Sequence, residues 1–237
     1  FKEEILFDQD RFITTVLRRP EFQRTMTGTE FRNLLGKYYA VQEQKFGVAP
    51  GLLSTCWERD VPVFVGAPGD GSAYLNHVKL WALAQAGRIK HKFELDVAKE
   101  VFESCAYHYW GLTTGAKRLA ILILGGGVPK NFSLQPEPTL GQIFLLDGIR
   151  GYDFDVQIVG APVTDGSLTS CKPAEAHTWG KVSAEALAST VESFQADYST
   201  LMPLLVWALM EKRKRHSGYH CGQHYRLFGQ RKELMAT

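Results

Sequence analysis

The stretch from Lys172 to Lys181 combines side chains that can hold and attack a cationic amine. Pro173 suits the first position of a helix, because its fixed φ angle and missing N–H cost nothing there. Glu175 and Trp179 then fall on one helix face, where a carboxylate and an aromatic ring together attract an ammonium group. A lysine partly desolvated beside an indole loses proton affinity, which makes Lys181 a better nucleophile towards an imine carbon. Taken alone, the stretch also fits a capped surface helix with a packing tryptophan and a solvated lysine.

Alternating strands and helices must position these side chains. Continuous apolar runs at 61–65 and 119–124 have the length of strands buried on both faces of a parallel sheet, and further strands are expected at 154–159 and 190–194. Helices are expected between and around them, at 10–17, from a Thr29 cap to Gly47, from about Pro50, and at 72–86, 96–109 and 200–213. The pattern predicts an α/β fold, a doubly wound and mostly parallel sheet with helices on both faces, whose ligands bind at the carboxyl ends of the strands.

Glycines and aspartates follow the predicted strands. Gly125–Gly127 comes directly after one of them, and glycines there let a backbone approach a phosphate or ribose closely, while amides at the next helix start bind anions. Asp70, Asp165 and Asp197 each follow a strand, where a carboxylate accepts hydrogen bonds from ribose hydroxyls. A tight strand-to-helix turn is the alternative for the glycines, and a helix cap is the alternative for each aspartate.

The order and spacing of these motifs resemble the deoxyhypusine synthase family, and most of all its bacterial deoxyhypusine synthase-like branch. The resemblance runs from about Leu6 to about Leu209. Its specific blocks are GAPGDGS at 66–72, ILGGGVPKNF at 123–132, PAEAHTWGK at 173–181 and ADYSTLMPLL at 196–205.

The resemblance implies a Rossmann-like fold and an NAD-dependent aminobutyl or aminoalkyl transferase. In that family NAD takes a hydride from spermidine, a lysine captures the resulting imine, and the aminobutyl group passes to a protein lysine or a small amine. The matching positions are Lys181 for the catalytic lysine; Trp179, Glu175, Asn131 and Asn76 for polyamine binding; and Asp70, Gly125, Gly126, Asp165, Asp197 and Tyr198 for the cofactor. The resemblance also implies a homotetramer or dimer whose sites are shared between subunits.

The chain departs from the eukaryotic pattern at several of these positions. It carries Leu168 and the run 74–76 where eukaryotic members have acidic residues, and Asn131 where they have a histidine. Asn76 and Asn131 agree with the bacterial-like branch, which favours a changed acceptor over lost chemistry. The alternative is a catalytically inactive paralogue that serves as a structural or regulatory subunit of a larger assembly.

Composition bounds the remaining properties of the 237-residue chain. Residues 1–215 are expected to form one NAD-binding domain that lacks the family's N-terminal part, followed by a basic tail at 216–237. The formal charge of +2 argues against a nucleic-acid partner, and no apolar run is long enough to span a membrane. Four scattered cysteines favour a reducing compartment, expected to be the cytoplasm, or an organelle interior if a transit peptide preceded Phe1. No metal site is expected, although the tail residues His216, His220, Cys221 and His224 include zinc-ligand types.

Overall fold

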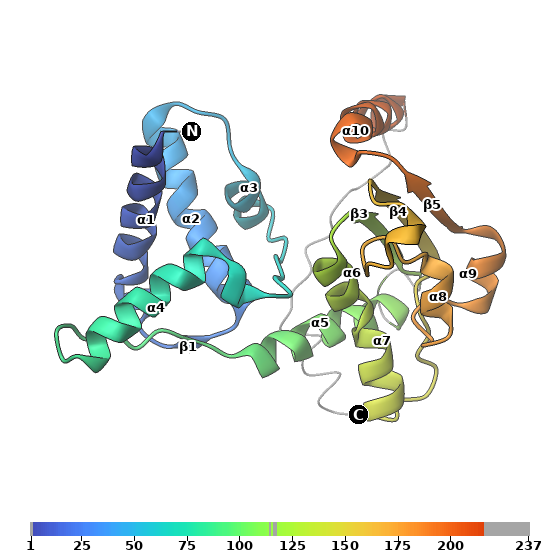
Figure 1. The fold of residues 1–237 in the computed structure, drawn as a ribbon, viewed down its shortest axis with the longest axis horizontal. Coiled ribbons are helices and arrows are strands. Elements are labelled where there is room, and N and C mark those ends of the chain that lie inside the picture. Colours follow the sequence, from blue (N-terminus) through green and yellow to red (C-terminus); the bar gives the residue numbers. More distant parts are fainter. Residues whose placement is uncertain (1, 114, 116–117, 216–237) are drawn as a thin grey trace. The chain divides into compact units, whose positions relative to one another are not determined.

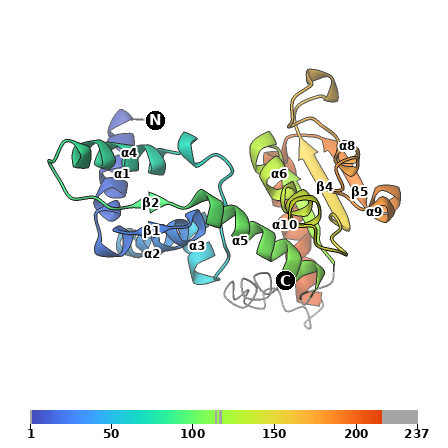
Figure 2. The ribbon, with the colours of Figure 1, turned by 90° about the horizontal axis from the view of Figure 1, so that it is seen from below.

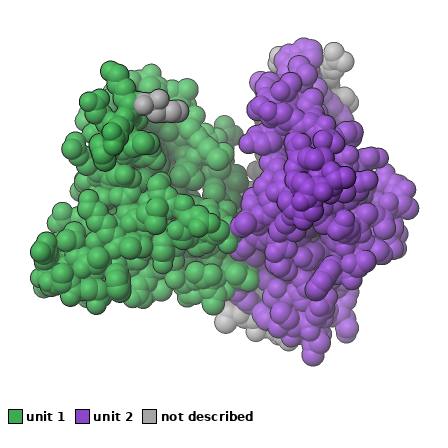
Figure 3. Space-filling view, viewed as in Figure 1, with its two compact units in different colours: residues 1–101 green, residues 102–237 purple. Residues whose placement is uncertain are grey.

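The computed structural model describes residues 2–113, 115 and 118–215, with side chains in the last helix described up to Lys212. The chain divides into two compact units, Phe1–Val101 and Phe102–Thr237, coloured separately in Figure 3. Whether residues 1–215 act as a single domain stays a prediction, and the tail at 216–237 lies outside the described residues.

Helices dominate the first unit. They are α1 (Glu3–Leu17), α2 (Gly28–Phe46), α3 (Leu52–Glu58) and α4 (Ser72–Gln85), with single 3₁₀ turns at Pro20–Phe22 and Pro68–Asp70. Two short strands, β1 (Thr25–Met26) and β2 (Glu94–Leu95), pair in parallel, and α5 (Val97–Leu112) then leads into the second unit (Figure 2). A cluster of buried apolar side chains forms the core of this unit: Ile13, Val16, Leu17, Phe22, Met26, Phe31, Leu35, Leu80 and Phe93.

The cap of α2 lies earlier than the sequence predicts. Thr27, and not Thr29, is the N-cap: its hydroxyl accepts a hydrogen bond from the Glu30 amide at 3.3 Å, and the Glu30 carboxylate accepts one from the Thr27 amide at 3.2 Å. This capping box needs a Glu or Gln three residues after the cap, which Thr27 has and Thr29 does not. At the other end Gly47 adopts a left-handed conformation (φ 64°) and ends the helix where expected.

Replacing Thr27 by alanine is expected to lower the free energy of unfolding by about 1–2 kcal/mol, because the Glu30 amide at the start of α2 loses its hydroxyl partner. Urea unfolding followed by circular dichroism measures this loss. Thr27→Ser keeps the capping hydroxyl and is the matched control. Equal destabilisation by both substitutions would show that the methyl group, and not the cap, matters at this buried position.

The prediction of a strand at 61–65 is wrong. These residues form no strand and belong to neither of the two sheets of the described residues. The Val63 carbonyl instead accepts a hydrogen bond from Arg32 Nε at 2.6 Å. An apolar run becomes a strand only when a neighbouring strand pairs with its amides and carbonyls, and 61–65 belongs to neither sheet of the described residues.

The second unit is built on a parallel sheet of β3 (Ala120–Leu124), β4 (Phe154–Val159) and β5 (Val191–Gln195), in that spatial order. Around it lie α6 (Gly127–Leu134), α7 (Pro136–Pro138) with a π turn at Thr139–Ile143, α8 (Pro173–His177), α9 (Ala184–Ser189) and α10 (Tyr198–Arg215) (Figure 1). The α/β fold with parallel strands is confirmed, and the strands match the predicted ranges within one or two residues. The short helix α9 was not predicted.

One face of this sheet supports the segment that carries the candidate chemistry. Leu134 of α6, Ala176 of α8 and Ala186 of α9 pack together with Val182, and Ile121 and Val191 of the sheet pack against them. The register places Ile121, Asp155 and Val191 in one row across the sheet. The core therefore fixes α6 and α8 over the same strands.

Candidate functional site

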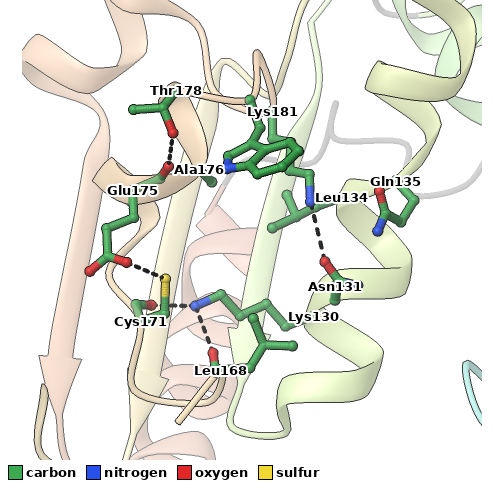
Figure 4. A pocket seen from close by; sticks show the side chains of 11 residues that line it. Lys130, Asn131, Leu134, Gln135, Leu168, Cys171, Glu175, Ala176, Thr178 and Lys181 are labelled. Atoms are coloured by element: carbon green, nitrogen blue, oxygen red, sulfur yellow. Dashed lines mark hydrogen bonds between the residues drawn. The ribbon is translucent and has the colours of Figure 1, made fainter. Parts of the chain in front are cut away.

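A pocket of about 510 Å³ lies in the second unit between α6 and the segment 168–181. Figure 4 shows its walls and the side chains that point into it. From α6 and its end come Lys130, Asn131, Leu134 and Gln135, and from the segment 168–181 come Leu168, Cys171, Glu175, Ala176, Thr178, Trp179 and Lys181. Four of the predicted site residues, Lys181, Trp179, Glu175 and Asn131, are therefore brought to one cavity.

A sharp turn after α8 places Lys181. The helix begins at Pro173, as predicted, and ends at His177. The Gly180 amide then donates to the His177 carbonyl at 2.9 Å and the Lys181 amide to the Ala176 carbonyl at 3.1 Å, the paired bonds of a Schellman turn. Gly180 has a φ of 74°, which favours glycine. The turn reverses the chain, so that the Lys181 side chain enters the pocket while Trp179 stays exposed.

Lys181 is half-buried, and its Nζ donates a hydrogen bond to Asn131 Oδ1 at 3.2 Å (Figure 4). Burial lowers the pKa of Lys181, while the charges of Glu137 and Cys171 act against that shift. A neutral amine is thus easier to form here than on a solvated lysine, which is what a nucleophilic lysine requires.

Glu175 lies on α8 with its carboxylate exposed to the pocket. Its Oε2 accepts a hydrogen bond from Cys171 Sγ at 3.2 Å. Burial and the neighbouring Glu175 carboxylate raise the pKa of the Cys171 thiol, so the cysteine stays a neutral donor. The Glu175 carboxylate thus lines the pocket, where it can attract a cationic ligand.

Lys130 is a pocket residue that the sequence reasoning missed. Its Nζ donates to Gln157 Oε1 at 2.6 Å and to the carbonyls of Leu168 and Cys171, and the side chain is buried. Burial lowers the pKa of Lys130, against the charges of Cys171, Asp155 and Glu175. Lys130 thus ties the loop before α8 to α6 and β4. Its position in the block at 123–132 was the available signal, but no spacing rule singles out that lysine.

Asp155 is a second buried group that the sequence did not reveal. It is fully buried in the middle strand, and neither carboxylate oxygen has a hydrogen-bond partner among the described residues. Burial raises its pKa to about 6, although the charge of Lys130 acts in the opposite direction. A buried carboxylate without partners favours its neutral form.

This raised pKa predicts a dependence of stability on pH. Between the ordinary value of 3.8 and about 6, the folded protein binds more protons at Asp155 than the unfolded chain does, so the free energy of unfolding falls as pH rises through that window. An amide at this position cannot ionise, so the Asp155→Asn variant is expected to exceed the native chain in stability at pH 7 by up to about 3 kcal/mol, with the gain shrinking towards pH 4.

Urea unfolding at pH 4, 5.5 and 7 measures this effect. Glu192→Gln, at an exposed carboxylate on the neighbouring strand β5, is the matched control and is expected to leave the pH dependence unchanged. A destabilised Asp155→Asn protein at pH 7 would contradict the assignment of Asp155 as a strained anion.

The predicted cofactor residues of the second unit lie at the carboxyl ends of the strands. Gly125 and Gly126, with φ of 63° and 74°, link β3 to the start of α6, and the Gly125 amide donates to the Ile158 carbonyl of β4 at 2.9 Å. A Cβ atom at Gly125 would lie 3.6 Å from the ring of Tyr198, so these two predicted residues are neighbours. The glycines and the free amides at the start of α6 fit the close approach of a dinucleotide.

Asp165 and Asp197 make local hydrogen bonds in the loops after β4 and β5. Asp165 accepts from Ser170 Oγ at 2.5 Å and from the Ser167 amide at 2.7 Å, and these bonds lower its pKa. Asp197 accepts from the Ser199 amide at 2.9 Å at the start of α10, which lowers its pKa. Both carboxylates are thus ionised and exposed, while Asp197 also fulfils the helix-capping alternative.

Asp70 and Asn76 belong to the first unit and Lys181 to the second, so a site shared by the three residues stays a prediction. Asp70 is exposed and follows no strand, contrary to expectation, since the run at 61–65 does not form one. Asn76 is buried in α4: it donates to Asp10 Oδ1 at 2.7 Å and accepts from Thr14 Oγ at 2.7 Å. It also lines a separate cavity of about 460 Å³ between α1 and α4.

Two exclusions concern the described part of the chain alone. Residues 2–113, 115 and 118–215 contain no group of three or more His, Cys, Asp or Glu side chains arranged to hold a metal ion. Among the helices formed by these residues, none has the length and apolar character needed to cross a membrane. The zinc-ligand residue types of the tail, from His216 to His224, lie outside the described residues.

Comparison with known proteins places this geometry in context. The family model for deoxyhypusine synthase matches residues 1–209. A deoxyhypusine synthase-like protein of Nostoc punctiforme is 37% identical over 213 residues, which are 90% of this chain and 52% of the relative. A probable deoxyhypusine synthase of Pyrococcus abyssi is 28% identical over 193 residues, or 81% of this chain and 50% of the relative. The chain spans about half the length of the curated relatives it matches.

Proposed function

Because the chain belongs to the deoxyhypusine synthase family, we propose that the protein transfers an aminobutyl or other aminoalkyl group from a polyamine such as spermidine to an acceptor amine. In this proposal NAD is the cofactor and Lys181 is the covalent carrier. The observation that carries the proposal is the half-buried Lys181 amine in a pocket that also contains the Glu175 carboxylate and the indole of Trp179.

The residues of the pocket divide the work of binding between them. Glu175 and Trp179 offer a carboxylate and an aromatic face, which together attract the ammonium groups of a polyamine. Asn131 accepts the hydrogen bond of the Lys181 amine and so fixes its direction towards the pocket. The substrate would therefore be held with a carbon beside its secondary amine close to Nζ.

Bound NAD would supply the oxidation, by accepting a hydride from the carbon beside the secondary amine. Gly125, Gly126, Asp165, Asp197 and Tyr198 are the residues of this unit that would hold it. The neutral Lys181 amine then adds to the substrate imine, and the bond to the leaving 1,3-diaminopropane breaks. The aminobutyl group remains on Nζ as an imine until an acceptor amine displaces the lysine, and the hydride held by the reduced cofactor would then return to the imine on the acceptor. The lowered pKa of Lys181 assists its addition to the substrate imine, since only the neutral amine carries the attacking electron pair.

For Asp70 and Asn76 the proposal rests on the family resemblance alone. They are assigned to cofactor and substrate binding by their match to the family blocks and lie in the other unit. An assembly of two or four subunits with shared sites is proposed on the same ground. An additional protein subunit would be required only if the chain were inactive.

The inactive paralogue remains the second candidate, and one observation favours it. Leu168 lies in the pocket wall, where a carboxylate would strengthen the binding of a polyamine. Among the described residues that line the pocket, Glu175 alone is acidic. A folded, assembled protein that binds NAD but never converts a polyamine would fit this candidate.

The test is to incubate the natural full-length protein with NAD and spermidine and to measure 1,3-diaminopropane by chromatography. NAD-dependent release of 1,3-diaminopropane is the expected outcome. Putrescine as an added acceptor then separates a small-amine acceptor from a protein acceptor, since it accelerates turnover only in the first case. Absence of release from folded, NAD-bound protein would reject the transferase.

A further inference from the structure

Glu137 of α7 is a buried carboxylate that the proposed mechanism does not yet use. Its residue is 8% exposed, and its Oε2 atom has no hydrogen-bond partner in the described part of the chain. Buried carboxylates ordinarily have partners, because an unpaired charge in a dry environment is destabilising. A nearby positive charge would therefore stabilise the ionised form of this carboxylate.

The turn that carries Lys181 is shaped to admit this carboxylate. A Cβ atom at Gly180 would lie 2.7 Å from Glu137 Oε1 and 2.9 Å from Oε2, so a side chain there would push the carboxyl group out of its place. Gly180 also adopts the left-handed φ of 74°. Both the backbone conformation and the space beside it therefore favour glycine at position 180. The Glu137 carboxyl group packs directly against this residue, which precedes Lys181.

The charges of Glu137 and Lys181 act on one another. Burial raises the pKa of Glu137 and the charge of Lys181 lowers it, while burial lowers the pKa of Lys181 and the charge of Glu137 raises it. The other ionisable groups around Lys181 are Cys171 before α8, Glu175 on α8 and Lys130 on α6. Of these, Cys171 also acts on Lys181, but its thiol is neutral, which leaves Glu137 as the main opposing charge.

We propose that Glu137 is a positioning residue for the reaction, a buried carboxylate packed behind Gly180 whose negative charge stabilises the Lys181 ammonium as long as no substrate is bound. This inference rests on the proposed function. When a polyamine enters, its ammonium groups repel the charge on Nζ. An N–H bond of Lys181 then breaks, the electron pair stays on the nitrogen and the proton leaves to water.

The experiment measures the proton affinity of Lys181 without substrate. Competitive acetylation over a range of pH, resolved by peptide mass spectrometry, gives the labelling rate at Lys181. Glu137→Gln keeps the size of the side chain and removes its charge, so labelling at pH 7 is expected to rise by about three- to tenfold, with the midpoint moving to lower pH. A midpoint that stays in place or moves to higher pH would overturn the inference.

Two further variants complete the design. Glu185→Gln removes an exposed carboxylate of α9 that does not line the pocket, and it is expected to leave the labelling profile unchanged. Glu137→Asp keeps the charge and is expected to label like the native protein; if it labels like Glu137→Gln, the role of Glu137 is structural and the inference fails. Because labelling needs neither NAD nor spermidine, a shifted midpoint without 1,3-diaminopropane release would reject the transferase alone.

Discussion

The Lys181→Ala variant is expected to lose aminoalkyl transfer by a factor of about 10³ or more while remaining folded. Without Nζ no covalent carrier exists, and removal of a nucleophile from a site that acts as a unit abolishes nearly all of its catalytic advantage. The folded state is expected to persist, since the Schellman turn is made by backbone atoms of Gly180 and residue 181. The rate of 1,3-diaminopropane release and a thermal melt measure the two effects.

Lys172→Ala is the matched control for this prediction. Lys172 precedes α8, is exposed and does not line the pocket. Its loss changes the net charge by the same amount and should leave the rate within about a factor of two, because a solvated surface charge acts weakly over that distance. A comparable loss in both variants would mean that charge, and not the Lys181 amine, matters for turnover.

The largest expected effect on stability concerns the buried ion pair of the first unit. Arg32 of α2 donates through Nη2 to Glu100 Oε1 of α5, and the two side chains are 7% and 3% exposed. Burial lowers the pKa of Arg32 and Glu100 opposes that shift, so the guanidinium depends on its partner. Glu100→Gln leaves a buried, unpaired guanidinium and is expected to lower the free energy of unfolding by about 3–5 kcal/mol.

Urea unfolding followed by far-ultraviolet circular dichroism measures this loss. Asp8→Asn breaks the exposed pair of Asp8 with Arg11, in which both side chains are mostly exposed, and should change stability by less than about 1 kcal/mol. The double variant Arg32→Met, Glu100→Leu replaces both charges and should recover part of the loss. Equal stability of Glu100→Gln and Asp8→Asn would contradict the assignment of a buried pair.

The elements of the second unit followed from the sequence because their signals are local. The apolar run that became β3 is directly followed by Gly125, and Pro173 marked the start of α8. Lys181, Glu175 and Trp179 could be placed together because they share one short segment. Asn131 joined them only through the resemblance to the family, since α6 is distant in the chain.

Long-range features escaped the sequence. The run at 61–65 has the composition of a strand, but its composition does not show whether another strand pairs with it in the folded chain. Glu137, Lys130 and Asp155 lie on three separate elements, and their importance arises from burial and from each other's charges, which no spacing rule contains. The assignment of Asp70 and Asn76 to the same site as Lys181 stays a prediction for the same reason.

The most direct test of the account is borohydride trapping of the natural full-length protein with labelled spermidine and NAD, followed by intact mass and peptide mapping. The account predicts an aminobutyl adduct that requires NAD, maps to Lys181 and is absent from the Lys181→Ala variant. No adduct on folded, NAD-saturated protein, or an adduct that persists in the variant, would contradict it.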